Sequence, residues 1–582
     1  MEQDDTIIRR SVPALPAGAA RIGREGDVKR SFDSQKKNPI RLYLGEPLIL
    51  RIEFQTHIDD ALVVCHTNFN HKDHSWRQLQ LTEKTDGVYE LKAVSTNCGE
   101  FAFRIKYSFD GGKSWIWDRA SLMHVHVDPP RMKAVRSYTM IPTALGTTDK
   151  WTAHLDHVRR MGFNMVHLLP VTRMGGSASP YSAADLFSMD PMFVPRKSRK
   201  TDVDGLETFE KFVYAAREHE ISLCIDLVLN HVAPDSEIAR SAPDWIMPDK
   251  TEQDGFQRSG CWHMDQWLKW GDLVKIYYDH PDEDTRKAIW EYMRDYAFFW
   301  AYYADFTGGM VRLDNLHNSD EDFISYLLDE LRIAYPRLIV HAEFFSDSNT
   351  LLKRARDWDL NLFLANPWEY PYAENLRDYL KHCHEIGSRV PQYTPVTTHD
   401  TGAPASLFGS PLAAIPRYFI TALFSTGQTG LVQGVEYAVP EKVPFIGRNL
   451  SFPYKLNETI TEMITRINAI LAQHDFLHQA GNLKFIDGNH GAIVGGFRTA
   501  AEADDAGQGL LLFANLDTRN DHFLDVDLHK LTGLSTCRLQ DVMYSVAPFD
   551  AGKKFRVSLS PCGVAVYRVL PDSSTPASTT SK

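Results

Sequence analysis

Four polar clusters follow short apolar runs in the middle of the chain, and their residue types are suited to acid–base chemistry. They span Asp226 to His231, Arg312 to His317, His341 to Glu343 and Thr398 to Asp400. If each apolar run is a strand of one parallel sheet, the clusters meet at the edge where the strands end. Bringing carboxylates together costs free energy through repulsion and desolvation, so a fold with such a cluster usually uses it for binding or catalysis.

A pair of carboxyl groups at such an edge is what the cleavage of an acetal requires. One carboxylate attacks or stabilises the anomeric carbon, the other protonates the leaving oxygen, and no organic cofactor takes part. A single aspartate at a strand end is more often a helix N-cap. Four clusters in chain order nevertheless favour the chemical interpretation for Asp226, Asp314, Glu343 and Asp400.

Alternating strands and helices are predicted around these clusters. Helical segments such as 206–219 and 320–335 separate the strands. The strands are expected at 164–170 and 221–228, and further ones end near Leu313, Val340, Thr397 and Val432. About eight strand–helix units between residues 134 and 476 predict an α/β fold of the (β/α)8 TIM-barrel type. A doubly wound open sheet is the alternative.

The rest of the chain is predicted to divide into β-rich and irregular regions. We expect a disordered or extended segment at 1–38, an immunoglobulin-like β-sandwich at 39–128, the barrel at 129–480, a C-terminal all-β domain at 481–570 and a disordered tail at 571–582.

An inserted subdomain at about 232–284, after the third barrel strand, is expected to cover the active face. It contains Trp245, Trp262, Trp267 and Trp270. We expect at least one of the last three to line a substrate groove. The other interpretation is that they pack the core of the subdomain.

The composition restricts the partners. The 582 residues include 63 Lys and Arg and 75 Asp and Glu, a net charge of −12, which favours a neutral substrate over nucleic acid or an anionic membrane. No membrane-spanning run or secretory leader is recognised, so a cytoplasmic location is expected. Seven scattered cysteines without a Cys-x-x-Cys pair disfavour a disulfide scaffold or a structural zinc site. The sequence indicates no oligomeric state.

The strand-end clusters resemble the signatures of the α-amylase family, glycoside hydrolase family 13. The likeness runs from about Pro142 to Asn449 and includes Pro180-Tyr181-Ser182 and Gly434-Val435-Glu436. Within the family, residues 162–191 and 312–317 are most similar to the glucanotransferase part of glycogen debranching enzymes. The second catalytic domain of those enzymes has no counterpart here.

The resemblance implies a role for each matching residue. Asp314 would be the nucleophile, Glu343 the general acid and base, and Asp400 a carboxylate that holds sugar hydroxyls. Arg312 is expected to keep Asp314 ionised, whereas Glu343 needs surroundings less favourable to charge. The implied substrate-binding residues are Tyr181, Asp226, His231, Arg312, His317 and His399.

The implied activity is retaining cleavage of α-1,4-glucosidic bonds in an α-glucan or malto-oligosaccharide, through a covalent glycosyl–Asp314. The sugar would pass to another glucan, as in a 4-α-glucanotransferase, or to water, as in an amylase-type hydrolase. Maltosyl transfer from a phosphorylated donor is a further option. A catalytically inactive glycan-binding or interaction protein on the same barrel is the alternative of a different class.

No cofactor is required for this chemistry, but the resemblance raises the question of a structural calcium ion. Asn230 matches an asparagine that helps to bind calcium in many amylases. An asparagine hydrogen-bonded to its own loop is the other interpretation.

Overall fold

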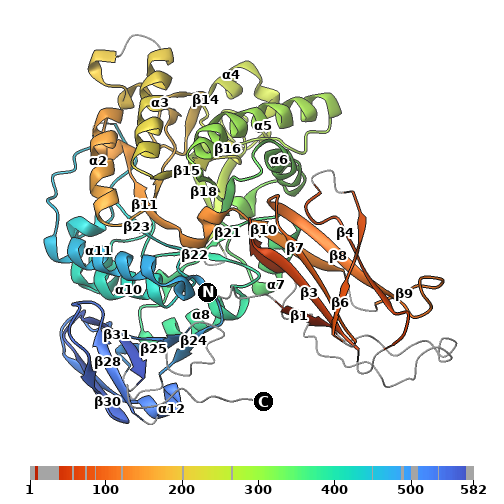
Figure 1. Ribbon diagram of the computed structural model, residues 1–582. Helices are drawn as coiled ribbons and strands as arrows, with labels where there is room; N and C mark the ends of the chain where they lie inside the picture. The colour runs from red at the N-terminus through yellow and green to blue at the C-terminus, as the bar shows by residue number, and fades with distance from the viewer. Residues whose placement is uncertain are drawn as a thin grey trace.

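The structure is a computed structural model of the chain, coloured from the N-terminus to the C-terminus in Figure 1. The predicted C-terminal tail lies outside the described residues apart from Pro571, and only Ile7–Arg10 of the predicted N-terminal segment is described. The described residues are 7–10, 39–54, 58–71, 75–85, 87–118, 122–198, 202–263, 266–448, 450–486, 491–499, 509–534 and 536–571.

Eight parallel strands close into a barrel, which confirms the predicted (β/α)8 fold and rules out the open sheet. The strands follow one another around the barrel in chain order. Both faces of each strand are covered, so the strands are apolar along most of their length. They are β11 (Arg136–Met140), β12 (Met165–Leu168), β15 (Ser222–Leu227), β19 (Met310–Leu313), β20 (Ile339–Ala342), β21 (Leu362–Leu364), β22 (Gln392–Pro395) and β23 (Thr429–Val432).

Helices surround the barrel and bury one apolar face each against it (Figure 1). Several begin at a capping carboxylate: Asp282 accepts a hydrogen bond from the Thr285 N–H, and Asp320 from the Phe323 N–H. The main helices are α2 (Thr148–Arg160), α3 (Asp202–Glu218), α5 (Glu283–Phe306), α6 (Glu321–Ala334), α7 (Ser348–Asp357), α8 (Ala373–Ile386), α10 (Ala414–Leu423) and α11 (Glu458–Gln473).

Two β-sheets pack around one apolar core before the barrel. One has the order β1-β3-β7-β6, and the other β2-β10-β8-β4-β5 with β9 paired to β8. Phe101, Phe103, Ile105 and Tyr107 of β8 all lie in this core, with the period of two of a half-buried strand. The strands are β1 (Ile7–Arg10), β2 (Ile40–Tyr43), β3 (Pro47–Glu53), β4 (Leu62–Thr67), β5 (Arg77–Gln80), β6 (Thr82–Thr85), β7 (Val88–Val94), β8 (Gly99–Ser108), β9 (Ile116–Trp117) and β10 (Met123–Asp128).

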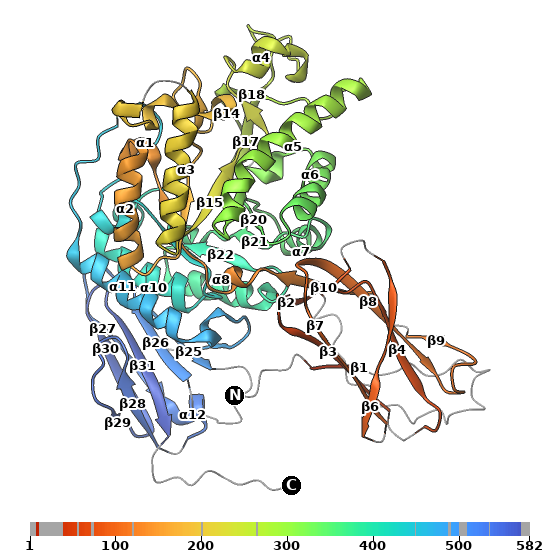
Figure 2. The same ribbon diagram turned by 45° about the horizontal axis from the view of Figure 1, so that its top comes forward.

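This sandwich is attached at the end of the barrel where the strands begin. Arg41 donates two hydrogen bonds to Asp128, of 2.8 and 2.7 Å, and Asn361 donates a third to the same carboxylate at 2.8 Å. His126 Nδ1 lies 2.8 Å from Asp359 Oδ1. Because residues 359–361 immediately precede β21, these contacts lie opposite the face on which the predicted site sits. Figure 2 shows the sandwich extending away from the inserted subdomain.

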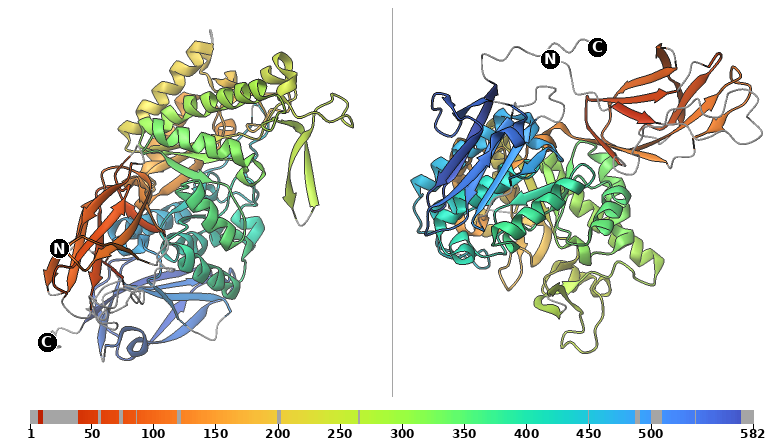
Figure 3. Two further views of the ribbon diagram at one scale, coloured as in Figure 1. Left: turned by 90° about the vertical axis from the view of Figure 1, so that its right-hand side faces the viewer. Right: turned by 90° about the horizontal axis from the view of Figure 1, so that it is seen from below.

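The long connection after β15 forms the predicted subdomain. It contains β16 (His231–Val232), α4 (Glu237–Ser241), β17 (Arg258–His263) and β18 (Gln266–Lys275). The three strands form a sheet in the order β16-β18-β17, and the β17–β18 hairpin projects from the body of the molecule (Figure 3). A second, shorter hairpin follows β12 and consists of β13 (Thr172–Met174) and β14 (Ala183–Met189).

After the barrel the chain forms a six-stranded sheet in the order β24-β25-β26-β31-β28-β29 and a two-stranded sheet of β27 and β30. These sheets enclose their own apolar core. The elements are β24 (Leu483–Phe485), β25 (Ile493–Thr499), β26 (Gly509–Asn515), β27 (His522–Asp527), α12 (Leu528–Thr532), β28 (Cys537–Asp541), β29 (Phe549–Asp550), β30 (Lys554–Leu559) and β31 (Val564–Pro571).

Arg498 of β25 joins this C-terminal domain to the barrel. It is fully buried, and none of the ion pairs among the described residues includes it. Burial lowers its pKa to about 9. Its guanidinium instead donates to the Asn482 side chain and to the backbone carbonyl oxygens of Leu423, Ser425, Phe476 and Gln479.

His384 of α8 is buried beside this junction, and we expect it to make the protein sensitive to acid. Its Nε2 donates to the Phe424 carbonyl oxygen at 2.8 Å, and its Nδ1 accepts from the Gly481 N–H at 3.0 Å, so the neutral ring satisfies both nitrogens. Burial, reinforced by Arg498, lowers its pKa to about 4. Protonation would break the bond from Gly481.

Between the ordinary histidine pKa of about 6.5 and the folded value of about 4, the unfolded chain binds a proton that the folded state excludes. The free energy of unfolding should therefore fall as the pH falls through this window, by up to about 1.4 kcal/mol per pH unit for one histidine. Urea unfolding at pH 7 and pH 5 measures the loss. Between pH 7 and pH 5, the free energy of unfolding of His384→Gln should fall less than that of the wild type or of the exposed-site control His529→Gln. An equal fall in all three proteins would contradict the role assigned to His384.

In the part of the chain that the structure describes, no helix combines the length and apolar character needed to cross a membrane.

Candidate active site

Polar side chains from adjacent strands lie at one level inside the barrel. The register pairs Asp226 of β15 with Arg312 of β19, and Arg312 with His341 of β20. On β11 and β12, Thr139 is paired with His167 in the same way. Because alternate residues of a strand face the same side, Asp314 and Glu343 follow Arg312 and His341 toward the open end.

Arg312 is the centre of the site, since its guanidinium contacts three carboxylates. Nη1 donates to both oxygens of Asp226 at 2.7 Å and to Asp314 Oδ1 at 2.9 Å. Nη2 lies 2.7 Å from Glu343 Oε2. The structure thus brings together the four charged residues that the sequence placed at three different strand ends.

The shared guanidinium sets the charges of these groups. Despite complete burial, Arg312 and His167 hold the pKa of Asp226 well below its usual range. Burial raises the pKa of Asp314, and the nearby Glu343 and Asp226 carboxylates raise it further, against the opposing effect of Arg312. Arg312 favours the ionised form of Asp314, as expected, while burial and the two neighbouring carboxylates oppose it.

Glu343 makes its described contacts through one carboxyl oxygen. Its Oε2 forms an ion pair with Arg312 Nη2 at 2.7 Å and accepts a hydrogen bond from the backbone N–H of Asn315 at 2.9 Å. Asn315 has φ of 48°, a left-handed conformation that asparagine tolerates better than most residues. The other carboxyl oxygen, Oε1, is engaged by neither of these two contacts.

Tyr181, His399 and Asp400 form the other side of the site. Tyr181 Oη donates to Asp226 Oδ2 at 2.9 Å and lies 2.6 Å from His399 Nε2, and the two rings are nearly parallel. His399 Nε2 also lies 3.1 Å from Asp400 Oδ2. Desolvation opposes the ionisation of Asp400, but His399, Arg312 and Lys442 lower its pKa to about 2. Its side chain is 54% exposed, so Asp400 is a charged group at the rim.

His231 and His317 are placed for ligand contacts in the described structure. Both ring nitrogens of His231 are buried without a hydrogen-bond partner, and burial lowers its pKa to about 4. Nδ1 of His317 is also buried and unpartnered, and burial lowers the pKa of this ring against the effect of Glu343. Neutral imidazoles with free nitrogens are suited to bonding hydroxyl groups.

The side chain of Asn230 is occupied by the protein itself. Its amide donates to the carbonyl oxygens of Asp314 and Asn315 at 3.3 and 3.0 Å, and its side-chain oxygen accepts from Ser319 Oγ. This geometry agrees with the interpretation of an asparagine hydrogen-bonded to its loop. A calcium ion would have to displace the bond from Ser319.

The β17–β18 hairpin lies against the catalytic loops. The carbonyl oxygen of Gly260 accepts from the side chains of Asn315 and Asn318, both at 3.4 Å. Burial and the charges of Glu343 and Asp400 raise the pKa of Cys261. The Trp270 ring meets the His231 ring edge to face at 5.9 Å. This hairpin is therefore one wall of the site.

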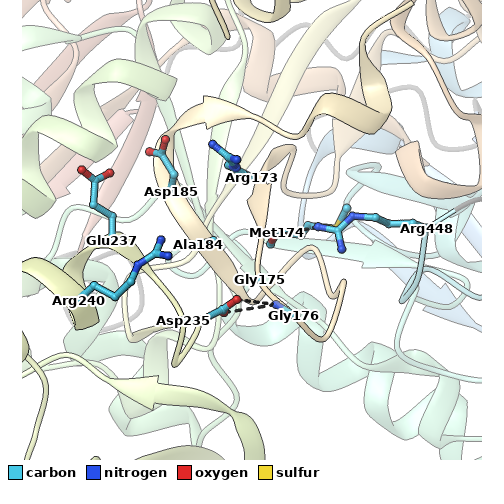
Figure 4. Close-up of a pocket in the computed structure, with 10 residues that line it drawn as sticks. All are labelled: Arg173, Met174, Gly175, Gly176, Ala184, Asp185, Asp235, Glu237, Arg240 and Arg448. Carbon is cyan, nitrogen blue, oxygen red and sulfur yellow. Dashed lines mark hydrogen bonds between the residues drawn. The ribbon is translucent and has the colours of Figure 1, made fainter. Parts of the chain in front are cut away.

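A polar cavity of about 580 Å³ lies on the other hairpin, around β13 and β14 (Figure 4). Arg173, Arg240 and Arg448 line it together with Asp185, Asp235 and Glu237. The loop that contributes Arg448 also carries Phe445, whose ring packs on Tyr181 and His399 at 6.0 and 5.2 Å. Arg448 is thus three residues along the chain from Phe445, a span of at most about 11 Å.

Sequence reasoning missed several members of the site. His167 lies 3.3 Å from Asp226, and His341 is buried with Nε2 unpartnered. Both could have been found from strand alternation, since His341 precedes Glu343 by two residues as Arg312 precedes Asp314. Phe445 and Cys261 lie in segments between barrel strands. No local sequence pattern predicts how these segments fold back toward the site.

Comparisons with known proteins agree with this geometry. The family model described as "Glycogen debranching enzyme, glucanotransferase domain" matches residues 131–252. An α-1,4-glucan:maltose-1-phosphate maltosyltransferase from Picrophilus torridus is 23% identical over 415 residues, which cover 66% of this chain and 60% of the relative. The enzyme of the same name from Arcanobacterium haemolyticum is 25% identical over 439 residues, 68% of this chain and 60% of the relative. The chain thus spans less than two thirds of these relatives.

Solved structures share the fold. An α-amylase from Lactobacillus plantarum superposes with a TM-score of 0.58 at 18% identity, over 76% of this chain and all of that one. A cyclomaltodextrinase superposes with a TM-score of 0.59 at 16% identity, over 92% of this chain and 98% of that one. The solved structures show that the chain has the fold of the α-amylases, and the matched family model and the maltosyltransferase relatives support its resemblance to the α-amylase family, glycoside hydrolase family 13.

Proposed function

We propose that this protein cleaves α-1,4-glucosidic bonds with retention of configuration and passes the released glucosyl chain to another glucan or to water. The observation that carries the proposal is the contact of one guanidinium, Arg312, with Asp226, Asp314 and Glu343. Two carboxylates held on one cation at the open end of the barrel provide a nucleophile and an acid side by side.

In the first step Asp314 attacks the anomeric carbon while Glu343 gives a proton to the leaving glycosidic oxygen. The C–O bond breaks, and the sugar becomes an ester of Asp314. In the second step Glu343 takes a proton from the acceptor hydroxyl, which displaces Asp314. Attack requires an ionised Asp314, and the contact with Arg312 at 2.9 Å favours that form.

A sugar ring at the cleavage position would lie against the polar groups that the protein leaves available. Tyr181 and Phe445 offer ring faces beside His399, and His231 and Asp400 offer hydroxyl partners. The β17–β18 hairpin, which contacts the catalytic loops through Gly260, offers further surface for a polymer substrate. We propose no metal or organic cofactor for the chemistry.

Incubation with maltoheptaose and chromatography of the products tests the proposal. Longer and shorter oligomers together indicate transfer, whereas shorter ones alone indicate hydrolysis. An unchanged substrate would favour the inactive glycan-binding protein, which binding of maltoheptaose without turnover would confirm.

A second candidate is maltosyl transfer from maltose 1-phosphate to a glucan, because the curated relatives carry that activity in their names. In that reaction phosphate leaves from the anomeric carbon and Asp314 would hold the maltosyl group. Release of inorganic phosphate from maltose 1-phosphate in the presence of glycogen supports it. If maltoheptaose is disproportionated but maltose 1-phosphate releases no phosphate, the result supports transfer between glucans, the first candidate.

The two hairpin tryptophans are expected to affect substrates of different length. Trp270 lies beside His231, so Trp270→Ala should lower kcat/KM for maltotriose and maltoheptaose alike. Trp267 is 43% exposed next to the hairpin turn, so Trp267→Ala should impair only maltoheptaose. Each effect should be roughly threefold to tenfold, the size of one aromatic contact of about 0.5–1.5 kcal/mol.

Steady-state kinetics with both oligomers measures this difference, and Trp76→Ala on the N-terminal sandwich is the matched control. Unchanged kinetics in both hairpin variants would show that the hairpin does not bind the glucan.

A further inference from the structure

A second group of titratable side chains lies away from the catalytic centre, between the barrel and α2. His154 and His157 are one turn apart on α2, and Glu436 belongs to the 3-10 helix Val435–Tyr437 after β23. One ligand atom of each lies within 4.8 Å of the other two. Among the described residues, this is the one group of three or more His, Cys, Asp or Glu side chains with metal-like spacing.

Glu436 lacks a full positive partner. It is completely buried, and its carboxylate accepts a 2.5 Å hydrogen bond from Tyr138 Oη and a 3.1 Å bond from the Gly434 N–H. Within the described structure no lysine or arginine pairs with it, and the nearest basic atom is His157 Nε2 at 3.8 Å from Oε1. Burying a carboxylate without a cationic partner costs free energy, so a bound cation would stabilise Glu436.

The two histidines place nitrogens beside the pair formed by Glu436 and Tyr138. His157 is 8% exposed, and its Nε2 is buried without a hydrogen-bond partner among the described residues. His154 Nε2 lies 3.0 Å from Tyr138 Oη, and burial lowers the pKa of His154 to about 4. A neutral imidazole is the form that binds metals. His154 is partly exposed, which provides a path from solvent.

We propose that His154, His157 and Glu436 bind a divalent transition-metal ion, with zinc as the best match. Two imidazole nitrogens and one carboxylate oxygen are a donor set that zinc accepts, whereas calcium and magnesium prefer oxygen ligands alone. Tyr138 keeps its bond to Glu436 and orients the carboxylate, while His154 Nε2 releases its proton to solvent and gives up its contact with Tyr138 Oη to bind the ion. Ligand distances of about 2.0–2.2 Å require the three side chains to rotate slightly inward.

The expectation against a zinc site came from the spacing of the cysteines, and this site contains none. The ion would connect α2 to the loop after β23, so its binding should stabilise the folded protein. The proposed metal site does not depend on the proposed glucan-cleaving function.

The experiment uses the full-length protein, stripped with EDTA, dialysed and titrated with zinc chloride. Elemental analysis should find about one zinc per chain, and the Tm should rise with zinc. His157→Gln and His154→Gln should bind zinc at least about tenfold more weakly. His219→Gln is the matched control, because it removes a surface histidine 3.1 Å from Asp156 of α2 and should bind zinc as wild type does.

Cobalt provides a readout that does not depend on the variants. Cobalt chloride added to the stripped wild-type protein should produce the visible absorption of a tetrahedral nitrogen–oxygen site, which zinc then displaces. The proposal is overturned if the wild type takes up no zinc and shows no cobalt spectrum, as expected if a protonated His157 simply pairs with Glu436. It is also overturned if both histidine variants bind zinc like the wild type. Neither result bears on glucan cleavage.

Discussion

Replacing Asp314 by alanine is expected to lower kcat on the order of 10³-fold or more, with the fold intact. The side chain contacts Arg312 at 2.9 Å and belongs to no apolar cluster, so its loss removes a reaction path and little packing. Arg312 retains Asp226 and Glu343 as partners, so no unpaired cation is left behind. Turnover of maltoheptaose measures the effect.

A thermal unfolding curve close to that of wild type shows that the Asp314 variant is folded. Asp525→Ala, which removes an exposed carboxylate paired with Arg556 in the C-terminal domain, is the matched control and should keep full activity. Near-normal turnover in the Asp314 variant would remove it as the nucleophile.

Glu343→Gln is expected to be slowed by about 10²- to 10⁴-fold on maltoheptaose, the usual contribution of a general acid. Glutamine keeps the acceptor for Arg312 and for the Asn315 N–H but cannot give a proton from the other atom. With α-maltosyl fluoride, whose leaving group needs no protonation, the first step should recover a large part of the lost rate. Single-turnover release of fluoride measures that step.

The same variant can reveal the intermediate. When deglycosylation lacks its base, the maltosyl group should accumulate on the peptide that contains Asp314, where mass spectrometry detects it. Equal impairment with maltoheptaose and maltosyl fluoride would assign the proton transfer to another group. A maltosyl group found on a different carboxylate would identify that residue as the nucleophile in place of Asp314.

The barrel could be predicted from sequence because most of its strands are buried apolar runs that end in polar clusters. Residues 164–170 and 221–228 enclose β12 and β15, and the runs ending near Leu313 and Val340 match β19 and β20. The sixth strand, β21, has three residues and is held by its neighbours on both sides. A run so short carries no period that a sequence pattern could detect.

Within the site, positions were predictable and charges were not. A residue directly after a barrel strand must lie at the open end, which located Asp314 and Glu343. Which carboxylate gains most from Arg312 depends on ångström-scale distances: Asp226 receives two contacts of 2.7 Å, and Asp314 one of 2.9 Å. Sequence spacing carries no information at that scale.

The fully buried Arg498 limits how this protein can be shortened. Its guanidinium is satisfied by four backbone carbonyl oxygens from the end of α10 and the segment after α11, and not by an acid of its own domain. A barrel expressed without the C-terminal strands would leave those carbonyl groups unpaired in an apolar seam, and the isolated strands would carry a charge with no place to bury it. Engineering that exchanges modules should therefore keep the barrel and the C-terminal sheets together as one unit.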